Sequence, residues 1–206
     1  MTTILNLSTS FYSQDGQSSR LAQQYIDALR DREPGAHVIE RDLAHEPVPH
    51  LDAARFQAFL TPPEQRTAAQ HAVADFSDAL IDELRAADVL VLGLPMYNFG
   101  VPSQLKAYFD HIARAGVTFR YTDQGPVGLL QGKKAYVFAT RGGRYAGTPN
   151  DTQTAYVRQF LGFLGITEVE FIYAEGLALG PEAREASLVQ ARAAVQNAAP
   201  RQSLAA

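Results

Sequence analysis

The sequence predicts an α/β protein built on a doubly wound parallel sheet. Short apolar segments alternate with stretches of helical periodicity, which is the pattern of repeated βαβ units. One segment, residues 89–92, is uniformly apolar, as expected of a strand buried on both faces. Shortly after it comes Pro95-Met96-Tyr97-Asn98-Phe99. These side chains would follow the carboxyl end of a parallel strand, where open α/β sheets bind ligands.

The expected strands are short apolar runs at residues 4–8, 38–43, 89–94, 135–140 and 169–174. We expect the first helix to begin near Ser18, a good N-cap residue, and to end before Pro34-Gly35. A longer helix is expected from about residue 63 to residue 87. The apolar positions that should turn this helix toward the sheet are Val73, Phe76, Leu80 and Leu84.

The remaining helices have clear boundary signals. Pro102 suits the first turn of the third helix, Gly165 should end the fourth, and the last follows Pro181-Glu182. The third helix has an apolar stripe of Leu105, Tyr108, Phe109 and Ile112, and the fourth has Val157, Phe160, Leu161 and Leu164. Two insertions interrupt the alternation, at residues 44–63 and 117–134, and long insertions in a compact α/β domain are often functional.

Five strands separated by helices, with unusual loops after the first and third, describe the flavodoxin-like fold. The expected strand order is 2-1-3-4-5, with helices on both faces of the sheet. We expect a single domain over residues 1–206, with a frayed tail at residues 198–206. The loops at residues 10–18, 95–102 and 140–150 should then converge at one edge of the sheet.

The composition restricts the classes of function. The chain has 206 residues, of which 46% are hydrophobic, so it can bury a sizeable core. Its formal net charge is -4 and its basic residues form no stripe, so we expect no nucleic-acid partner. The sequence contains no cysteine, which excludes disulfides and thiolate metal sites. No metal site is expected, because no pair has metal-ligand spacing among His37, His45, His50, His71 and His111.

Nothing near the start of the sequence resembles a targeting segment. The residues Met1-Thr2-Thr3-Ile4 enter a strand directly, without a basic region or a long apolar stretch. No apolar run approaches the about 20 residues needed to cross a bilayer. We therefore expect a soluble cytoplasmic protein with no membrane partner.

The loop after the first strand is rich in hydroxyl groups and opens a helix. It reads Ser8-Thr9-Ser10-Phe11-Tyr12-Ser13-Gln14-Asp15-Gly16-Gln17-Ser18-Ser19. The free backbone N–H groups and the positive dipole end of a helix can bind a phosphate monoester there without any lysine or arginine. The alternative is that Ser18 only caps the helix and that the other serines form a solvated turn.

The loops after the third and fourth strands suit a planar heterocycle. Asn98 offers a backbone N–H and an amide to ring heteroatoms, and Met96 is a deformable apolar wall. Tyr97 and Phe99 offer flat faces, unless they are core aromatics at a strand end. In Thr140-Arg141-Gly142-Gly143, two residues without a Cβ let backbone N–H groups approach a ligand and stabilise the charge of a reduced ring. A simple Gly-Gly turn is the alternative.

These segments together resemble a known family. The block from Val91 to Tyr121, with Pro102-Ser103-Gln104-Leu105-Lys106 inside it, and the motif Arg141-Gly142-Gly143 are similar to the FMN-dependent NADH azoreductase/NADH:quinone oxidoreductase family. The similarity covers essentially the whole chain, including Ala174-Glu175-Gly176. It implies a flavodoxin-like homodimer that holds one FMN per subunit near the subunit interface.

The resemblance also implies which residues hold the cofactor. The phosphate would be held by Ser10, Gly16, Gln17 and Ser18, the ring by Pro95, Met96, Tyr97, Asn98 and Phe99, and the pyrimidine edge by Thr140, Arg141, Gly142 and Gly143. Gly16 stands where many relatives have serine, so only its backbone N–H can serve, and a lost hydrogen bond weakens binding by about 1 kcal/mol. Thr140 stands where some relatives have serine and keeps the hydroxyl group.

Three aromatic residues are candidates for stacking on flat acceptors: Phe99, Tyr121 and Phe163. Tyr121, with Phe119, lies in the excursion that covers the flavin in this family, and Phe163 would be contributed across the dimer. For these residues, local packing of a hairpin is the alternative.

The resemblance implies a ping-pong reaction with no essential acidic or basic side chain. NADH or NADPH would pass hydride to the flavin and leave, and a quinone, an azo compound or a nitroaromatic would then be reduced in the same cleft. A second hypothesis is a flavodoxin-like electron carrier that docks on protein partners, although the excess of acidic residues is small. An ordinary NAD-dependent dehydrogenase lacks support, because no Gly-x-Gly-x-x-Gly follows the first strand.

Overall fold

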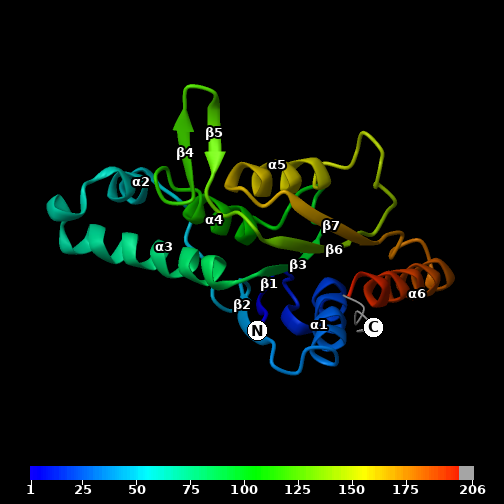
Figure 1. Ribbon diagram of the computed structural model, residues 1–206. Coiled ribbons are helices and arrows are strands. Elements are labelled where there is room, and N and C mark those ends of the chain that lie inside the picture. Colours follow the sequence, from blue (N-terminus) through cyan, green and yellow to red (C-terminus); the bar gives the residue numbers. More distant parts are fainter. Residues whose placement is uncertain (200–206) are drawn as a thin grey trace.

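The computed structural model describes residues 1–199 and has a parallel sheet with helices on both faces (Figure 1). The sheet is 5-stranded, in the order β2-β1-β3-β6-β7. All of its neighbouring strands are parallel. The strands β4 and β5 form a separate antiparallel pair, so this order is the predicted 2-1-3-4-5. The prediction of a flavodoxin-like fold is confirmed.

Each strand of the sheet begins and ends within one residue of its predicted bounds. The strands are β1 (Thr3–Ser8), β2 (His37–Asp42), β3 (Val89–Pro95), β6 (Lys134–Thr140) and β7 (Glu168–Ala174). The central strand β3 is buried along nearly its whole length, whereas the edge strand β2 is only half-buried. A strand that is covered on both faces needs an uninterrupted apolar run, which is why β3 was the clearest strand in the sequence.

The helices cover the two faces of the sheet in two groups (Figure 1). On one face lie α1 (Gln17–Arg30) and α6 (Pro181–Ala198), and on the other lie α3 (Ala68–Ala86), α4 (Ser103–Ile112) and α5 (Thr154–Leu164). Neighbouring residues of a strand point to opposite faces. Ile4 and Val91 therefore belong to the core under α1 and α6, while Leu5 and Leu92 belong to the core under α3, α4 and α5.

Two helices begin at other residues than predicted. α1 begins at Gln17 with Gly16 as its N-cap, so Ser18 lies inside the first turn and does not cap the helix. α3 begins at Ala68, because Thr67 and Gln70 form a capping box that satisfies backbone N–H groups on both sides of the helix start. The segment Pro63–Gln65, where the helix was expected to start, is a separate 3-10 turn.

The buried face of α3 also differs from the prediction. Leu80 and Leu84 are buried as expected, but Phe76 is 40% exposed and Val73 is only half-buried. Smaller residues, among them Ala74 and Ser77, are buried on this face of α3, and Ser77 donates a hydrogen bond to the carbonyl of His111 in α4. The partly exposed ring of Phe76 meets the ring of His111 edge-on, with centroids 5.7 Å apart. The predictions for α4, α5 and α6 are confirmed, including the left-handed Gly165 that ends α5.

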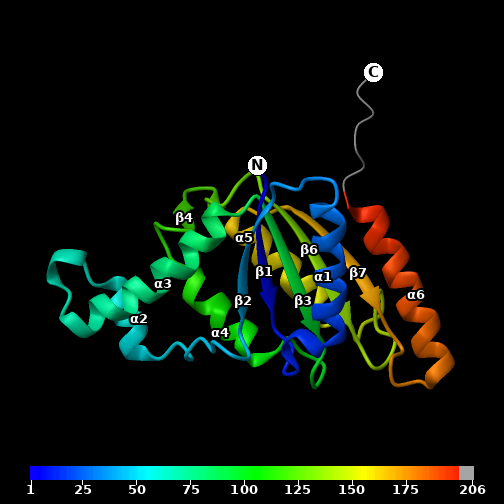
Figure 2. The same ribbon diagram turned by 90° about the horizontal axis from the view of Figure 1, so that it is seen from below.

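Both insertions have regular structure. The first contains α2 (Ala53–Leu60), which packs on α3 at the side of the molecule away from α6 (Figures 1 and 2). The second is the hairpin of β4 (Phe119–Thr122) and β5 (Gly125–Gly128). At the predicted frayed tail, Ala198 is still helical and Ala199 is buried, and residues 200–206 lie outside the described residues.

Candidate functional site

The loops that follow β1, β3 and β6 meet at the carboxyl edge of the sheet and line an open cavity of about 190 Å³. In Figure 2 the strands β1 and β3 point toward this edge. The predicted cofactor residues that line the cavity are Ser10, Gly16, Gln17, Ser18, Pro95, Met96, Tyr97, Thr140, Arg141 and Gly142. Asn98, Phe99 and Gly143 are their neighbours in the loops but do not line it. The expected convergence of three loops is therefore what the structure contains.

The first end of the cavity is the N-terminus of α1. Its N-cap, Gly16, has no side chain that could satisfy the N–H groups of the first turn. The hydroxyl of Ser18 is buried and has no hydrogen-bond partner among residues 1–199, whereas Ser19 is paired with Ser8 at 2.8 Å. A buried hydroxyl without a partner costs free energy, and an anion at this position would remove that cost by accepting the hydrogen bond.

Gly16 is required at this end by lack of space. A Cβ on Gly16 would lie 2.2 Å from the Oγ of Ser10 and 2.6 Å from its Cβ. The backbone of Gly16 has an ordinary φ of -65°, so the need for glycine is not a matter of strain. The side chain of Ser10 is buried and accepts a hydrogen bond from the N–H of Tyr12 at 3.2 Å. In this chain, therefore, a serine at position 16 would compete with Ser10 for the same volume.

The loop after β3 is a tight turn that places aromatic residues at the rim. Tyr97 and Gly100 exchange backbone hydrogen bonds, and Asn98 and Phe99 between them have φ of 50° and 60°. Asparagine tolerates this left-handed region better than most residues, and a turn with two such residues is typical of tight hairpins. Phe99 is 59% exposed, so it is not the core aromatic that was considered as an alternative. Phe11 stacks on Tyr97 with ring centroids 4.0 Å apart, which joins the first two loops.

The glycines after β6 present N–H groups at the second end of the cavity. The carbonyl groups of Arg141, Gly142 and Gly143 accept hydrogen bonds from the loop after β7. Among the described residues, no acceptor is bonded to the N–H of Gly142 or of Gly143. Two donors without partners at a cavity edge are suited to stabilise negative charge on a planar ligand. This arrangement is more specific than the simple Gly-Gly turn that the sequence also allowed.

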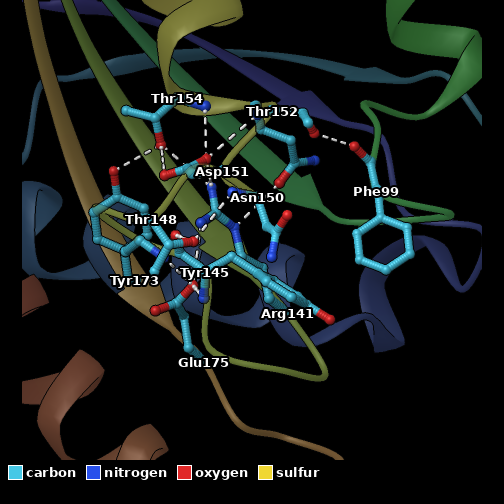
Figure 3. A network of polar contacts seen from close by, with 12 residues as sticks. Phe99, Arg141, Tyr145, Thr148, Asn150, Asp151, Thr152, Thr154, Tyr173 and Glu175 are labelled. Carbon is cyan, nitrogen blue, oxygen red and sulfur yellow. Dashed lines mark hydrogen bonds and ion pairs between the residues drawn. The ribbon is translucent and has the colours of Figure 1, made fainter.

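The side chain of Arg141 is buried, and its guanidinium lies among Asp151, Thr154 and Glu175 (Figure 3). It is 0% exposed and lies between the carboxylates of Asp151, at 2.8 Å, and Glu175, at 3.1 Å. Burial would raise the pKa of Asp151, but hydrogen bonds from Arg141 and Thr154 outweigh it and hold that pKa below its ordinary value. Arg141 lines the cavity, and its predicted contact with the cofactor stays a prediction, but each nitrogen of its guanidinium already donates to a protein partner.

Comparison with known proteins identifies the family. Residues 2–199 match the model of a family described as having a flavodoxin-like fold. A Burkholderia lata protein named FMN-dependent NADH:quinone oxidoreductase 6 is 58% identical over 195 residues, which is 95% of this chain and 98% of that protein. The chain belongs to the family of FMN-dependent NADH:quinone oxidoreductases.

Two further matches agree with this family. A protein of Alcanivorax borkumensis named FMN-dependent NADH:quinone oxidoreductase is 55% identical over 189 residues, covering 92% of this chain and 96% of that protein. The crystal structure of an azoreductase from Bacillus anthracis superposes with a TM-score of 0.85 at 28% identity, covering 96% of this chain and 100% of that chain. The resemblance predicted from the loop motifs is thus confirmed.

None of the three predicted stacking residues lines the three-loop cavity of its own chain, although Phe99 lies in one of the loops that form it. Tyr121 is 74% exposed and lines a different cavity, of about 610 Å³, next to Phe119 and Arg114. The ring of Phe163 packs against Phe119, with centroids 4.3 Å apart. Within one chain these rings show the local hairpin packing that was the alternative to a lid. Their role across a dimer stays a prediction.

Two residues that line the cavity of this family member were not predicted. Tyr12 is 73% exposed at the cavity's first end, and its neighbour Ser13 has a φ of 49° that the sequence did not reveal. Leu177 comes from the loop after β7, whose N–H groups bond the carbonyls of the Arg141 loop. The motif Ala174-Glu175-Gly176 was part of the resemblance, and its position directly after a strand was the signal that could have led to Leu177.

Neither a membrane-spanning helix nor a metal-binding cluster is found within residues 1–199. None of the helices within residues 1–199 combines the length and hydrophobicity needed to span a bilayer. In the same residues, histidine, aspartate and glutamate side chains form no group of three or more that could hold a metal ion.

Proposed function

We propose that this protein is an FMN-dependent oxidoreductase that uses NADH to reduce quinones and azo compounds. One observation carries the proposal: a single cavity has the N-terminus of α1 and the unpartnered hydroxyl of Ser18 at one end, and at the other Gly142, whose N–H, like that of the neighbouring Gly143, is bonded to no acceptor among the described residues. The names of the relatives, which include an FMN-dependent NADH:quinone oxidoreductase and an azoreductase, support it. They give no support to the hypothesis of an electron carrier.

The residues of the cavity fit FMN. The N-terminus of α1, with the Ser18 hydroxyl, would hold the phosphate, because a helix N-terminus binds anions without a basic side chain. Met96 and Tyr97 would contact the flat ring, and the N–H groups of Gly142 and Gly143 would bond its pyrimidine edge. When bound, FMN supplies two-electron chemistry between NADH and the acceptor.

The protein itself contributes binding and electrostatics to this reaction. Backbone N–H groups fixed in a turn stabilise negative charge without having to reorganise. The cavity is open, and the exposed ring of Tyr12, which lines it, would give a flat acceptor or a nicotinamide an aromatic surface to lie against, as would the exposed ring of Phe99 in the neighbouring turn. We infer no essential acid or base. NADPH as donor and nitroaromatics as acceptors belong to the same proposal.

Assembly and location are part of the proposal too. We propose a homodimer with the cofactor near the interface, because the cavity of one chain is open and the exposed ring of Tyr121, with the half-buried Phe163 nearby, does not line the cavity of its own chain. Light scattering at low protein concentration tests the dimer. A cytoplasmic location, where NADH is available, is tested by cell fractionation.

The decisive experiment compares FMN with riboflavin, which lacks the phosphate. Purified apoprotein is titrated with each flavin while the flavin fluorescence is followed, and the loaded protein is then assayed with NADH and a quinone. We expect a yellow complex with FMN, much weaker binding of riboflavin, and activity only in the loaded protein. Equal affinity for the two flavins, or activity in the flavin-free protein, would contradict the proposal.

A further inference from the structure

A buried polar cluster lies directly behind the second end of the cavity, and the proposed reaction does not use it. Its centre is the guanidinium of Arg141, which donates hydrogen bonds to Gln153, Glu175, Asp151 and Thr154 (Figure 3). The guanidinium also lies over the ring of Tyr173, 5.1 Å from its centroid. An arginine whose three guanidinium nitrogens all donate to protein groups is held rigidly, because its planar fork cannot rotate without breaking several bonds.

One arm of the cluster holds the loop that carries the glycines. Glu175 accepts a hydrogen bond from Arg141 and, with the same oxygen, from the N–H groups of Tyr145 at 2.8 Å and Ala146 at 2.9 Å. The Tyr145 ring lies so close to Gly143 that a Cβ there would be 2.6 Å from it. The same ring meets Phe99 edge-on, with centroids 5.6 Å apart. Glu175 therefore sets where the chain runs just after Gly142 and Gly143.

A second arm holds the turn on the other side of the cavity. Gln153 accepts from Arg141 and donates to the carbonyl groups of Pro95 and Gly100, each at 3.0 Å. Its neighbour Thr152 donates to the carbonyl of Phe99. Pro95 and Gly100 flank the tight turn that contains Tyr97 and Asn98, so Gln153 ties both sides of that turn to the arginine. Gln153 is itself fully buried, which makes its hydrogen bonds costly to lose.

The charges of the cluster exclude a direct electrostatic role toward a ligand. Two carboxylates surround the one guanidinium, and the side chain of Asp151 is only 7% exposed. The positive charge of Arg141 is thus neutralised inside the protein, before it could act on a flavin ring. The remaining role for Arg141 is to hold neighbouring segments in place.

We propose that Arg141 is a positioning residue for the ring end of the site. Through Gln153 and Glu175 it fixes the turn at residues 97–100 and the loop at residues 142–146 relative to each other, so that their separation is set before any flavin is bound. Preorganisation of this kind strengthens binding because the loops need not be ordered on association. The proposal rests on the proposed function, since the ring in question is that of FMN.

Two variants separate positioning from general stability. Gln153→Met keeps the arginine and both carboxylates but removes the second arm, and Arg141→Lys removes the fork while keeping the charge. The matched control is Arg41→Lys, because Arg41 also lies between two carboxylates, Glu46 and Glu83, but joins β2 to α3 and does not line the cavity. Each variant is studied as the full chain, with urea denaturation measured alongside.

Three measurements are made: the affinities for FMN and for riboflavin, the visible absorption spectrum of the bound flavin, and amide hydrogen exchange of the apoprotein. We expect Gln153→Met and Arg141→Lys to lower the affinities for FMN and for riboflavin by the same factor, about tenfold or more. The reason is that each variant loses buried hydrogen bonds behind the ring. The flavin spectrum should shift, and exchange should accelerate at residues 96–100 and 142–146. Arg41→Lys should leave the affinities, the spectrum and this exchange as in the wild type.

The outcomes distinguish this proposal from the proposed function. If the wild-type protein binds no FMN, the proposed function fails, while exchange in the apoprotein still tests the positioning. If Gln153→Met binds both flavins like the wild type and exchanges like the wild type, the positioning role is overturned even though the proposed function stands. Should Arg141→Lys not fold, Gln153→Met decides alone. A loss confined to FMN, with riboflavin unaffected, would also overturn the proposal, because it would place the effect at the phosphate end.

Discussion

The two ends of the cavity are built by opposite means. At the α1 end, one short segment of sequence supplies hydroxyl and N–H groups, and none of the charged side chains within residues 1–199 lines that end of the cavity. At the ring end, segments that follow β3, β6 and β7 are held together by a buried arginine with two carboxylates. The α1 end is formed by residues that are close in sequence, and it carries no desolvation cost of a buried charge.

The charged cluster at the ring end destabilises the folded protein unless all of its partners are present. Burying an ion pair roughly balances desolvation against attraction, but removing one partner leaves an uncompensated charge. We therefore expect a substitution at the α1 end to affect only its immediate neighbours. A substitution in the Arg141 cluster should weaken the whole ring end. The predictions below test that difference.

The largest effect is expected from Arg141→Met. It leaves Asp151 and Glu175 without their buried cation, so the free energy of unfolding should fall by about 3–5 kcal/mol. Urea denaturation measures this, with Arg41→Met as the control. Arg41 is 19% exposed and its partner Glu46 is 64% exposed, so the control should lose less. Equal losses would mean that the ring-end cluster is no more cooperative than an ordinary partly exposed ion pair.

A smaller effect on stability is expected at the α1 end from Gly16→Ala. The new Cβ collides with the buried Ser10 side chain, and overpacking of this kind costs about 1–3 kcal/mol. Thermal unfolding of the apoprotein measures the loss. The double variant with Ser10→Gly should recover most of it, because the colliding atoms are then absent. Failure of this rescue would show that the constraint on Gly16 is not Ser10.

Ser18→Ala should separate binding from stability. The apoprotein should be no less stable than the wild type, because the removed hydroxyl is buried without a partner. FMN should bind more weakly by about 1.5–3 kcal/mol, the size of a hydrogen bond to a charged group, while riboflavin should be unaffected. Fluorescence titration with both flavins measures this. An equal loss of affinity for riboflavin would show that Ser18 does not bind the phosphate.

The smallest effect is expected on the acid side of the stability curve. The pKa of Asp151 is lower in the folded protein than in the unfolded chain, so its contribution is fully present above the unfolded pKa and is lost as pH falls through the folded pKa. The free energy of unfolding should therefore decline below about pH 4, the unfolded pKa of an aspartate. Asp151→Asn should decline less steeply over the same range. An identical slope would mean that Asp151 does not titrate with folding.

Much of the fold and part of the site could be predicted because the signals are local. Apolar runs gave the strands to within one residue, Gly165 ended α5, and the hydroxyl-rich loop before α1 identified the anion end. The predicted start of α3 at about residue 63 was wrong, because Thr67 and Gln70 form a capping box and the helix begins at Ala68. Thr67 and Gln70 have the spacing of a capping box in the sequence, so this signal is also a local one.

The sequence by itself determined the order of the elements, the position of the loops and the family, since periodicity and motif spacing act within a few residues along the chain. Only the tertiary structure decided that Arg141 turns inward, that Gln153 reaches across to Pro95 and Gly100, and that Tyr121 lies over a different cavity. The physical reason is that the direction of a buried polar side chain is set by partners that lie far away in sequence. Those partners become neighbours only when parallel strands place their loops side by side.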